Sequence, residues 1–171
     1  TLEDLGLYKA DVACKRLKIL NPDINVQGYN IRFTNDSIHL MKDVDVIIDA
    51  TDNFKSRSLI NKISLLLKKP LVMGAAIKMQ GQVAVFRNDL CDMPCYNCLY
   101  DDIEDETSSC IDLGVLSTLT GIIGSLQATE AIKTLIGFGE SLESKLLLVD
   151  LKHMSFRTVK IVKDNKCKIC N

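Results

Sequence analysis

The sequence has no excess of positive charge. Its 171 residues contain 21 lysines and arginines against 22 aspartates and glutamates, which gives a formal net charge of −1. A chain without a basic surface has little to attract the phosphates of nucleic acid or the headgroups of an anionic membrane. We therefore expect neither nucleic acid nor a membrane among its partners. Hydrophobic residues at 47% and charged residues at 25% are ordinary globular values and argue against a disordered chain.

A signal peptide and a membrane-spanning segment are also missing. No basic segment followed by an apolar run comes after Thr1. The most apolar stretch, residues 113–137, contains Gln127, Glu130 and Lys133, so it is too polar for a bilayer and suits a buried helix. These absences predict a cytoplasmic protein.

The seven cysteines are an odd number without a secretory pattern, which argues against a framework of disulfides. Four of them form two distant Cys-x-x-Cys pairs, at Cys95, Cys98, Cys167 and Cys170. Two such pairs fit the four thiolates of a structural zinc site. The alternatives are cysteines without a common role, or a redox pair. A redox pair is expected at the start of a helix. Here Pro94 precedes the first pair and an acidic run follows it, which offers no such helix. Cys91 lies close enough in the sequence to replace one ligand.

Alternating strand-like and helix-like segments predict the fold class. An apolar run at 44–50, a helical segment at 53–68 and a buried strand at 70–77 are typical of a βαβ unit. We also expect helices at 7–20 and 37–42, strands at 24–31 and 81–87, a long helix ending near 137–139, and strands at 145–151 and 156–162. The prediction is one α/β domain over residues 1–171. It has a Rossmann-like, mostly parallel sheet with flanking helices, additional antiparallel strands and a zinc knuckle.

Residues 99–113 are unusual for a compact domain. They contain six acidic side chains and no basic one. Loops of that length are usually functional or mobile, and few apolar side chains here offset the entropy of ordering. We predict that this loop is mobile until a partner protein binds.

Three side chains are candidates for chemistry. Asp52, like Asp49, follows a buried strand, where open parallel sheets bind ligands, and a carboxylate there can hold magnesium. From spacing alone, a helix N-cap is the favoured interpretation of Asp52. Lys9 lies in the first turn of a helix, where a cation suits a nearby anion, although a solvated surface lysine is the simpler reading. Cys110 precedes the long helix, so it is either an activated nucleophile or a free structural cysteine.

Several blocks, taken in order along nearly the whole chain, resemble one known family. They are "KADVACKRLKILNP", "DATDNFKSRSLIN", "PLVMGAAIKMQGQVAVF", "PCYNCLY", "CIDLGVLSTLTGIIGSLQATEAIK" and "CKIC". Together they are similar to the bacterial ThiF/MoeB/HesA adenylyltransferases, which are related to ubiquitin-activating enzymes. The resemblance implies that the two Cys-x-x-Cys pairs hold one structural zinc.

The resemblance also implies a reaction. ATP and the C-terminal Gly-Gly carboxylate of a ubiquitin-like sulfur carrier give an acyl-adenylate and pyrophosphate, and a sulfur donor then forms a thiocarboxylate for thiamine or molybdopterin biosynthesis. Asp52 matches the aspartate near ATP and magnesium, and Lys9 matches a lysine on the phosphates. Cys110 matches a cysteine that passes sulfur in some members. Arg57 and Asn61 match the family's helix without an assigned role. A homodimer and a sulfurtransferase are the other implied partners.

The chain departs from the family at its start. The family begins with a strand, a glycine-rich phosphate loop, an acidic residue for ribose and an arginine for ATP, and this sequence has none of them. Its only Gly-x-x-Gly, Gly121 to Gly124, suggests close helix packing. We expect the C-terminal two-thirds of an adenylyltransferase, with roughly 70 residues in a separate N-terminal fragment. The alternatives are a non-catalytic member that binds a ubiquitin-like partner, and a nucleotide-binding oxidoreductase, which needs the absent Gly-x-Gly-x-x-Gly loop.

Overall fold

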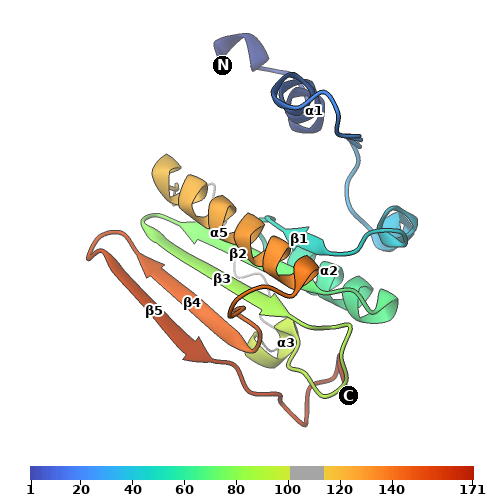
Figure 1. Ribbon diagram of the computed structural model, residues 1–171, viewed down its shortest axis with the longest axis vertical. Helices are drawn as coiled ribbons and strands as arrows, with labels where there is room; N and C mark the ends of the chain where they lie inside the picture. The colour runs from blue at the N-terminus through green and yellow to red at the C-terminus, as the bar shows by residue number, and fades with distance from the viewer. Residues whose placement is uncertain (101–113) are drawn as a thin grey trace. The chain divides into compact units, whose positions relative to one another are not determined.

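The computed structural model describes residues 1–100 and 114–171 (Figure 1). The chain divides into two compact units, Thr1–Thr34 and Asn35–Asn171. A single domain over the whole chain therefore stays a prediction. Most of the loop predicted to be mobile, residues 101–113, lies outside the described residues. None of the described helices is long and apolar enough to span a bilayer.

The first unit is built on helix α1 (Lys9–Leu20), which follows the short 3₁₀ helix η1 (Leu2–Asp4). The strand predicted at 24–31 is wrong, because these residues form no strand. Gly28 packs directly onto α1 instead. A Cβ added there would lie 2.7 Å from Cys14 Sγ and 3.2 Å from the Ala10 carbonyl oxygen. The segment is therefore placed by contact with a helix, and none of the sheet's strands pairs with it.

The second unit contains a five-stranded sheet in the order β1-β2-β3-β4-β5. The strands are β1 (Ile47–Asp49), β2 (Leu71–Ile77), β3 (Gln80–Phe86), β4 (Lys145–Asp150) and β5 (Ser155–Lys160). The α/β class and the antiparallel later strands are confirmed. The expected mostly parallel sheet is not seen in the described residues, where β1–β2 is the only parallel pair. Two residues join β2 to β3, and so short a connection permits only a hairpin.

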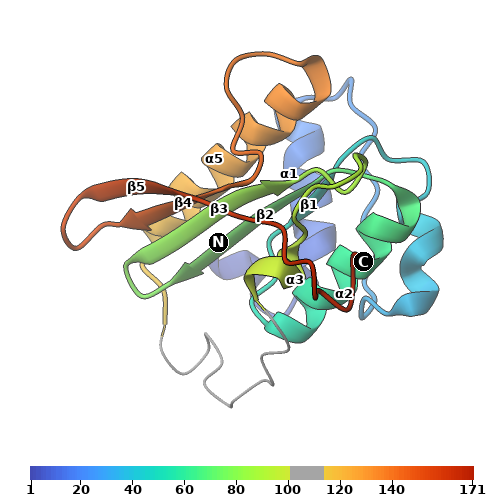
Figure 2. The same cartoon turned by 90° about the horizontal axis from the view of Figure 1, so that it is seen from below.

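Two long helices cover the sheet. Helix α2 (Phe54–Leu67) follows β1, and helix α5 (Ser117–Ile136) is the predicted long apolar helix. Figure 2 shows α5 on one face of the sheet, with α2 and the short α3 (Tyr96–Leu99) on the other side. Leu119 and Ile123 of α5 are buried against Val83 and Val149, so the core lies between this helix and the sheet. A 3₁₀ helix, η2 (Asn35–Met41), precedes β1 and overlaps the short helix predicted at 37–42.

The prediction of close packing at Gly121 and Gly124 is wrong for the part of the chain that the structure describes. Both glycines are exposed, and an added Cβ at either would meet nothing within 4 Å among those residues. Helix α5 contacts the sheet through its other side instead. The close approaches are made by sheet glycines: a Cβ on Gly81 would lie 2.5 Å from the Ile123 side chain.

Candidate functional site

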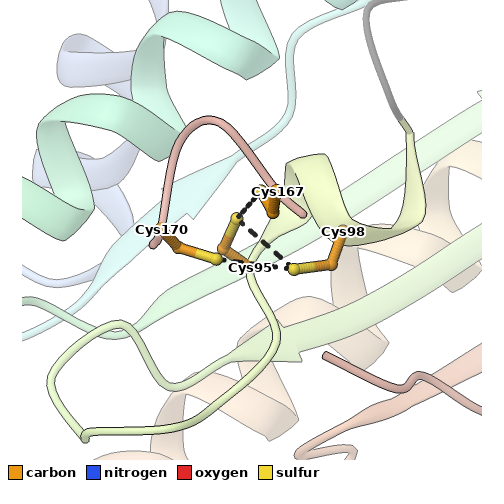
Figure 3. Close-up of side chains that lie close together, drawn as sticks. All are labelled: Cys95, Cys98, Cys167 and Cys170. Carbon is orange, nitrogen blue, oxygen red and sulfur yellow. Dashed lines mark hydrogen bonds between the residues drawn. The ribbon is translucent and has the colours of Figure 1, made fainter. Parts of the chain in front are cut away.

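The four paired cysteines converge in space. Figure 3 shows the side chains of Cys95, Cys98, Cys167 and Cys170 pointing toward one another. Cys95 is the N-cap of α3 and Cys98 lies within that helix, while the second pair lies in the last turn of the chain. All four sulfurs lie within 4.8 Å of one another, with Sγ–Sγ distances of 3.8 Å for Cys95–Cys167 and 3.5 Å for Cys98–Cys170. Four sulfurs bound to zinc at ~2.3 Å lie roughly 3.8 Å apart, so the arrangement fits that ion.

Cys91, which the sequence left as an alternative ligand, is exposed and is not part of the cluster. The described residues therefore select Cys95 and Cys98 from the middle of the chain. A redox pair needs two thiols, whereas four thiols meet here. With four protein ligands around a tetrahedral ion, no position is left for substrate.

Burial and hydrogen bonds set the protonation of these thiols. Burial raises the pKa of Cys95, although a hydrogen bond from the Asn61 side chain opposes it. Burial also raises the pKa of Cys170. For Cys167, burial is outweighed by the backbone N–H groups of Ile169 and Cys170, which lower its pKa. Metal binding must release the remaining protons, so affinity for a metal ion will fall as the pH falls.

A second group of polar residues shapes the carboxyl end of β1. Asp49 is 1% exposed, and its Oδ1 accepts hydrogen bonds from the backbone N–H and the hydroxyl of Thr51, both at 2.8 Å. Burial raises the pKa of Asp49, against these two hydrogen bonds. Arg57 donates from Nε and Nη2 to the Thr51 carbonyl, at 3.1 and 2.6 Å. The Asp49 carboxylate and the Arg57 guanidinium therefore both hold the turn between β1 and α2, through hydrogen bonds to Thr51.

Asp52 follows this turn and is exposed. The helix N-cap favoured for it is wrong: the cap of α2 is Asn53, whose side-chain oxygen accepts from the Ser56 N–H at 2.8 Å. Asn53 Nδ2 also donates to Asp52 Oδ1 at 3.2 Å. The Asp52 carboxylate thus lies beside the positive end of a helix, at the carboxyl end of a parallel strand. A carboxylate in that place suits a magnesium ion or a phosphate-bound metal.

The remaining candidates, Lys9 and Cys110, belong to other parts of the chain. Lys9 lies in the first turn of a helix, as predicted: it is the first residue of α1, and its side chain is exposed. It belongs to the first unit, whereas Asp52 belongs to the second. Cys110 lies outside the described residues.

Sequence reasoning gave no role to three buried residues that hold these sites. Arg57 fixes the turn before Asp52, Asn61 contacts the cysteine region, and Gln127 donates to the Asp49 carbonyl at 2.8 Å. The signal in the sequence that could have identified them is that each is a polar residue within a helix that packs against the sheet. A buried polar side chain needs hydrogen-bond partners, which predicts that it has a structural task.

Comparison with known proteins gives one consistent family. The model of the ThiF family matches residues 1–170. A sulfur carrier protein adenylyltransferase of Thermus thermophilus is 41% identical over 99% of this chain and 65% of its own length. A SAMP-activating enzyme E1 of Haloferax volcanii is 36% identical, and the adenylyltransferase and sulfurtransferase MOCS3 of Culex quinquefasciatus is 38% identical. These two cover 98% and 100% of the chain and 62% and 40% of their own lengths. The chain thus spans less than two thirds of these relatives.

Solved structures agree on the fold. MccB of E. coli, solved with MccA-N7isoASN, superposes with a TM-score of 0.83 at 16% identity, over 99% of this chain and 53% of MccB. A structure of the same enzyme with ATP gives a TM-score of 0.81 at 15% identity, over 99% and 53%. At this level of identity the likeness establishes the architecture alone.

Proposed function

The chain belongs to the ThiF family, and we propose that it forms the larger part of an enzyme that adenylates the C-terminal carboxylate of a ubiquitin-like sulfur carrier. The observation that carries this proposal is the exposed Asp52 carboxylate at the carboxyl end of β1. The names of the relatives, sulfur carrier protein adenylyltransferase among them, supply the substrate class.

In the proposed reaction a carrier carboxylate oxygen bonds to the α-phosphorus of ATP. The bond from that phosphorus to the bridging oxygen breaks, and pyrophosphate leaves with its electrons. The enzyme's task is to orient the two anions and to stabilise negative charge on the phosphates. Asp52 would hold Mg²⁺, which supplies positive charge at the phosphates when bound. Lys9 would contact the phosphates, and the turn held by Asp49 and Arg57 fixes the backbone that carries Asp52.

Zinc has a structural place in this proposal. Cys95, Cys98, Cys167 and Cys170 would hold one zinc ion, which ties the chain end to α3. Metal analysis of purified protein should find about one zinc per chain, because four thiolates make one tetrahedral site. A protein that is folded and free of zinc would contradict this part of the proposal.

Pyrophosphate exchange tests the catalytic part. The described residues contain no glycine-rich turn whose backbone N–H groups would cradle phosphates. The 171-residue chain by itself should therefore show no carrier-dependent exchange of labelled pyrophosphate into ATP. The protein in its full length should show it. In that protein Asp52→Ala should abolish exchange, and Asp43→Ala, also an exposed aspartate before α2, should keep it.

The same exchange assay distinguishes the roles proposed for Cys110 and Lys9. Cys110→Ser should leave exchange largely intact, because adenylation needs no thiol, and should affect only a later sulfur transfer. Lys9→Ala should lower exchange, while Lys15→Ala on the same helix should not. Exchange that survives Asp52→Ala would overturn the site assignment. A full-length protein that binds the carrier without any exchange would favour the non-catalytic alternative.

The finer assignments complete the proposal. The carrier would serve thiamine or molybdopterin biosynthesis in the cytoplasm, with a sulfurtransferase as donor, and the MOCS3 name supports that link. A homodimer is supported by apolar side chains that stay exposed at the end of α5 and just after it: Ile132, Leu135, Ile136 and Phe138. Sedimentation of the full-length protein tests the dimer.

A further inference from the structure

We propose that Asn61 of α2 is a positioning residue that anchors the zinc knuckle and couples it to the turn before Asp52. The inference rests on the zinc site of the proposed function. It concerns a residue that makes no metal bond itself.

The geometry starts with the side chain of Asn61, which is completely buried. Its Nδ2 donates to Asn97 Oδ1 at 3.0 Å, and its Oδ1 accepts from the Tyr96 backbone N–H at 3.3 Å. Tyr96 and Asn97 are the two residues between Cys95 and Cys98. One side chain of α2 therefore holds both intervening residues of the first metal-binding pair.

Further buried polar groups hold Asn61 in turn. Asn88 Nδ2 donates to Asn61 Oδ1 at 3.0 Å and to Ser64 Oγ at 2.9 Å. The Ser64 hydroxyl donates to the Lys69 carbonyl at 2.6 Å. Asn88 follows β3 and Ser64 lies on α2, so the network joins the sheet, the helix and the knuckle. A connected network of this kind fixes orientation more sharply than apolar packing does.

A simple core role does not account for this arrangement. A leucine at position 61 would fill similar space on the buried face of α2. It would also remove one hydrogen bond each from the Asn88 amide, the Asn97 oxygen and the Tyr96 N–H. Buried polar groups rarely lose a hydrogen-bond partner without a cost in stability. The polar groups of Asn61 are instead directed at the cysteine turn, as groups behind metal ligands are in other sites.

The same helix reaches the candidate catalytic edge. Arg57 lies four residues before Asn61, on the same side of α2, and holds the Thr51 carbonyl. The knuckle fixes α2 at Asn61, and α2 fixes the turn before Asp52 at Arg57. A structural metal in this protein would thus act on the catalytic edge through a single helix.

Zinc release from the purified chain tests the proposal. Zinc-loaded protein is mixed with a chromogenic chelator, and the release rate is followed. Asn61→Leu should release zinc about 10–100-fold faster, the range expected when a group behind the ligands is lost. Asn61→Asp keeps both acceptor contacts, but it loses the hydrogen bonds to Asn97 and Cys95 and places a buried carboxylate beside them, so it should also release zinc faster than wild type. Lys62→Ala, on the exposed face of the same helix, should match wild type.

Two readouts separate this role from loss of stability alone. Cobalt-substituted Asn61→Asp should show shifted thiolate-to-cobalt and d–d absorption bands, since the ligand geometry changes. In wild type, chelation should speed hydrogen exchange of the Thr51 amide, which the coupling to Arg57 requires.

The outcomes are distinct. Wild-type protein that takes up no zinc contradicts the proposed zinc site itself. Wild-type protein that binds zinc, with release rates and cobalt spectra unchanged in Asn61→Asp and Asn61→Leu, overturns the inference. If Asn61→Leu fails to fold, Asn61→Asp decides. Unchanged Thr51 exchange after chelation overturns the coupling.

Discussion

Gln127 illustrates how one polar side chain in an apolar helix positions the edge proposed to be catalytic. It is 4% exposed on α5, and its amide donates to the Asp49 carbonyl at 2.8 Å. The amide passes directly over Gly74 of β2, where a Cβ would lie 2.2 Å from Gln127 Cδ. Glycine at this position therefore makes room for the contact, and the contact fixes the end of β1 before Asp52.

Gly74→Ala should lower the free energy of unfolding by about 1–3 kcal/mol, because it displaces a buried amide from its partner. Urea denaturation of the zinc-loaded chain measures it. Gly124→Ala on the exposed face of α5 is the control. The described residues leave its Cβ in open space, so helix propensity should raise stability by up to about 1 kcal/mol. Equal losses in the two variants would contradict this account.

At the scale of elements, the start of α2 separates two neighbouring polar residues by role. Asn53 caps the helix by accepting a hydrogen bond from the Ser56 N–H, and the Asp52 carboxylate stays exposed to solvent.

Arg87 lies directly after β3 and joins this segment to the one before β4. It pairs with Asp89 at 2.7 Å and with Glu143 at 2.6 Å.

Asn53→Ala should lower the free energy of unfolding by about 1 kcal/mol, the usual value of an N-cap side chain. Asp52→Ala should cost less, because the capping bond to Ser56 is kept. Thermal denaturation of both variants, compared at equal zinc content, measures the difference. A larger loss for Asp52→Ala would restore Asp52 as the cap.

Asp89→Asn should lower stability by about 1 kcal/mol at pH 7. The hydrogen bond from Arg87 holds the pKa of Asp89 below its ordinary value of 3.8. A carboxylate with a lowered folded-state pKa contributes stability above the unfolded pKa and loses it as the pH falls through the folded one. The difference between variant and wild type should therefore shrink in urea titrations below pH 4. A difference that stays constant with pH would contradict the ion pair as its cause.

At the scale of the whole molecule, the cysteine cluster joins parts of the chain that are far apart. Cys95 and Cys167 are 72 positions apart, and their sulfurs lie 3.8 Å from each other. A metal ion there would tie the end of the chain, after β5, to the segment after β3. The free energy of metal binding at such a site adds to the stability of the folded chain.

Chelation of zinc should lower the melting temperature by on the order of 10 °C, since several kcal/mol of binding free energy are lost in a chain of this size. Cys167→Ser should reproduce most of the loss without chelator. Cys91→Ser, which removes an exposed thiol outside the cluster, should melt like wild type. Equal melting of Cys167→Ser and wild type in the presence of zinc would contradict a structural metal.

The sequence by itself determined the features that depend on local spacing. The apolar run at 44–50 gave the short strand β1, although Ile48 in its middle is exposed rather than buried, and the helical segment after it gave α2. The first Cys-x-x-Cys pair gave a turn that places its two sulfurs 4.0 Å apart. Order and spacing also indicated the family, because blocks in register along a chain are far more specific than one motif.

Only the tertiary structure decided which distant groups meet. It separated Cys91 from the cluster and brought Cys95 and Cys98 to Cys167 and Cys170. It also gave Arg57 and Asn61 their partners. Such contacts join segments that are remote or on different faces, so they follow from packing and from the need of each buried polar group for a partner. Residue spacing carries no record of that pairing.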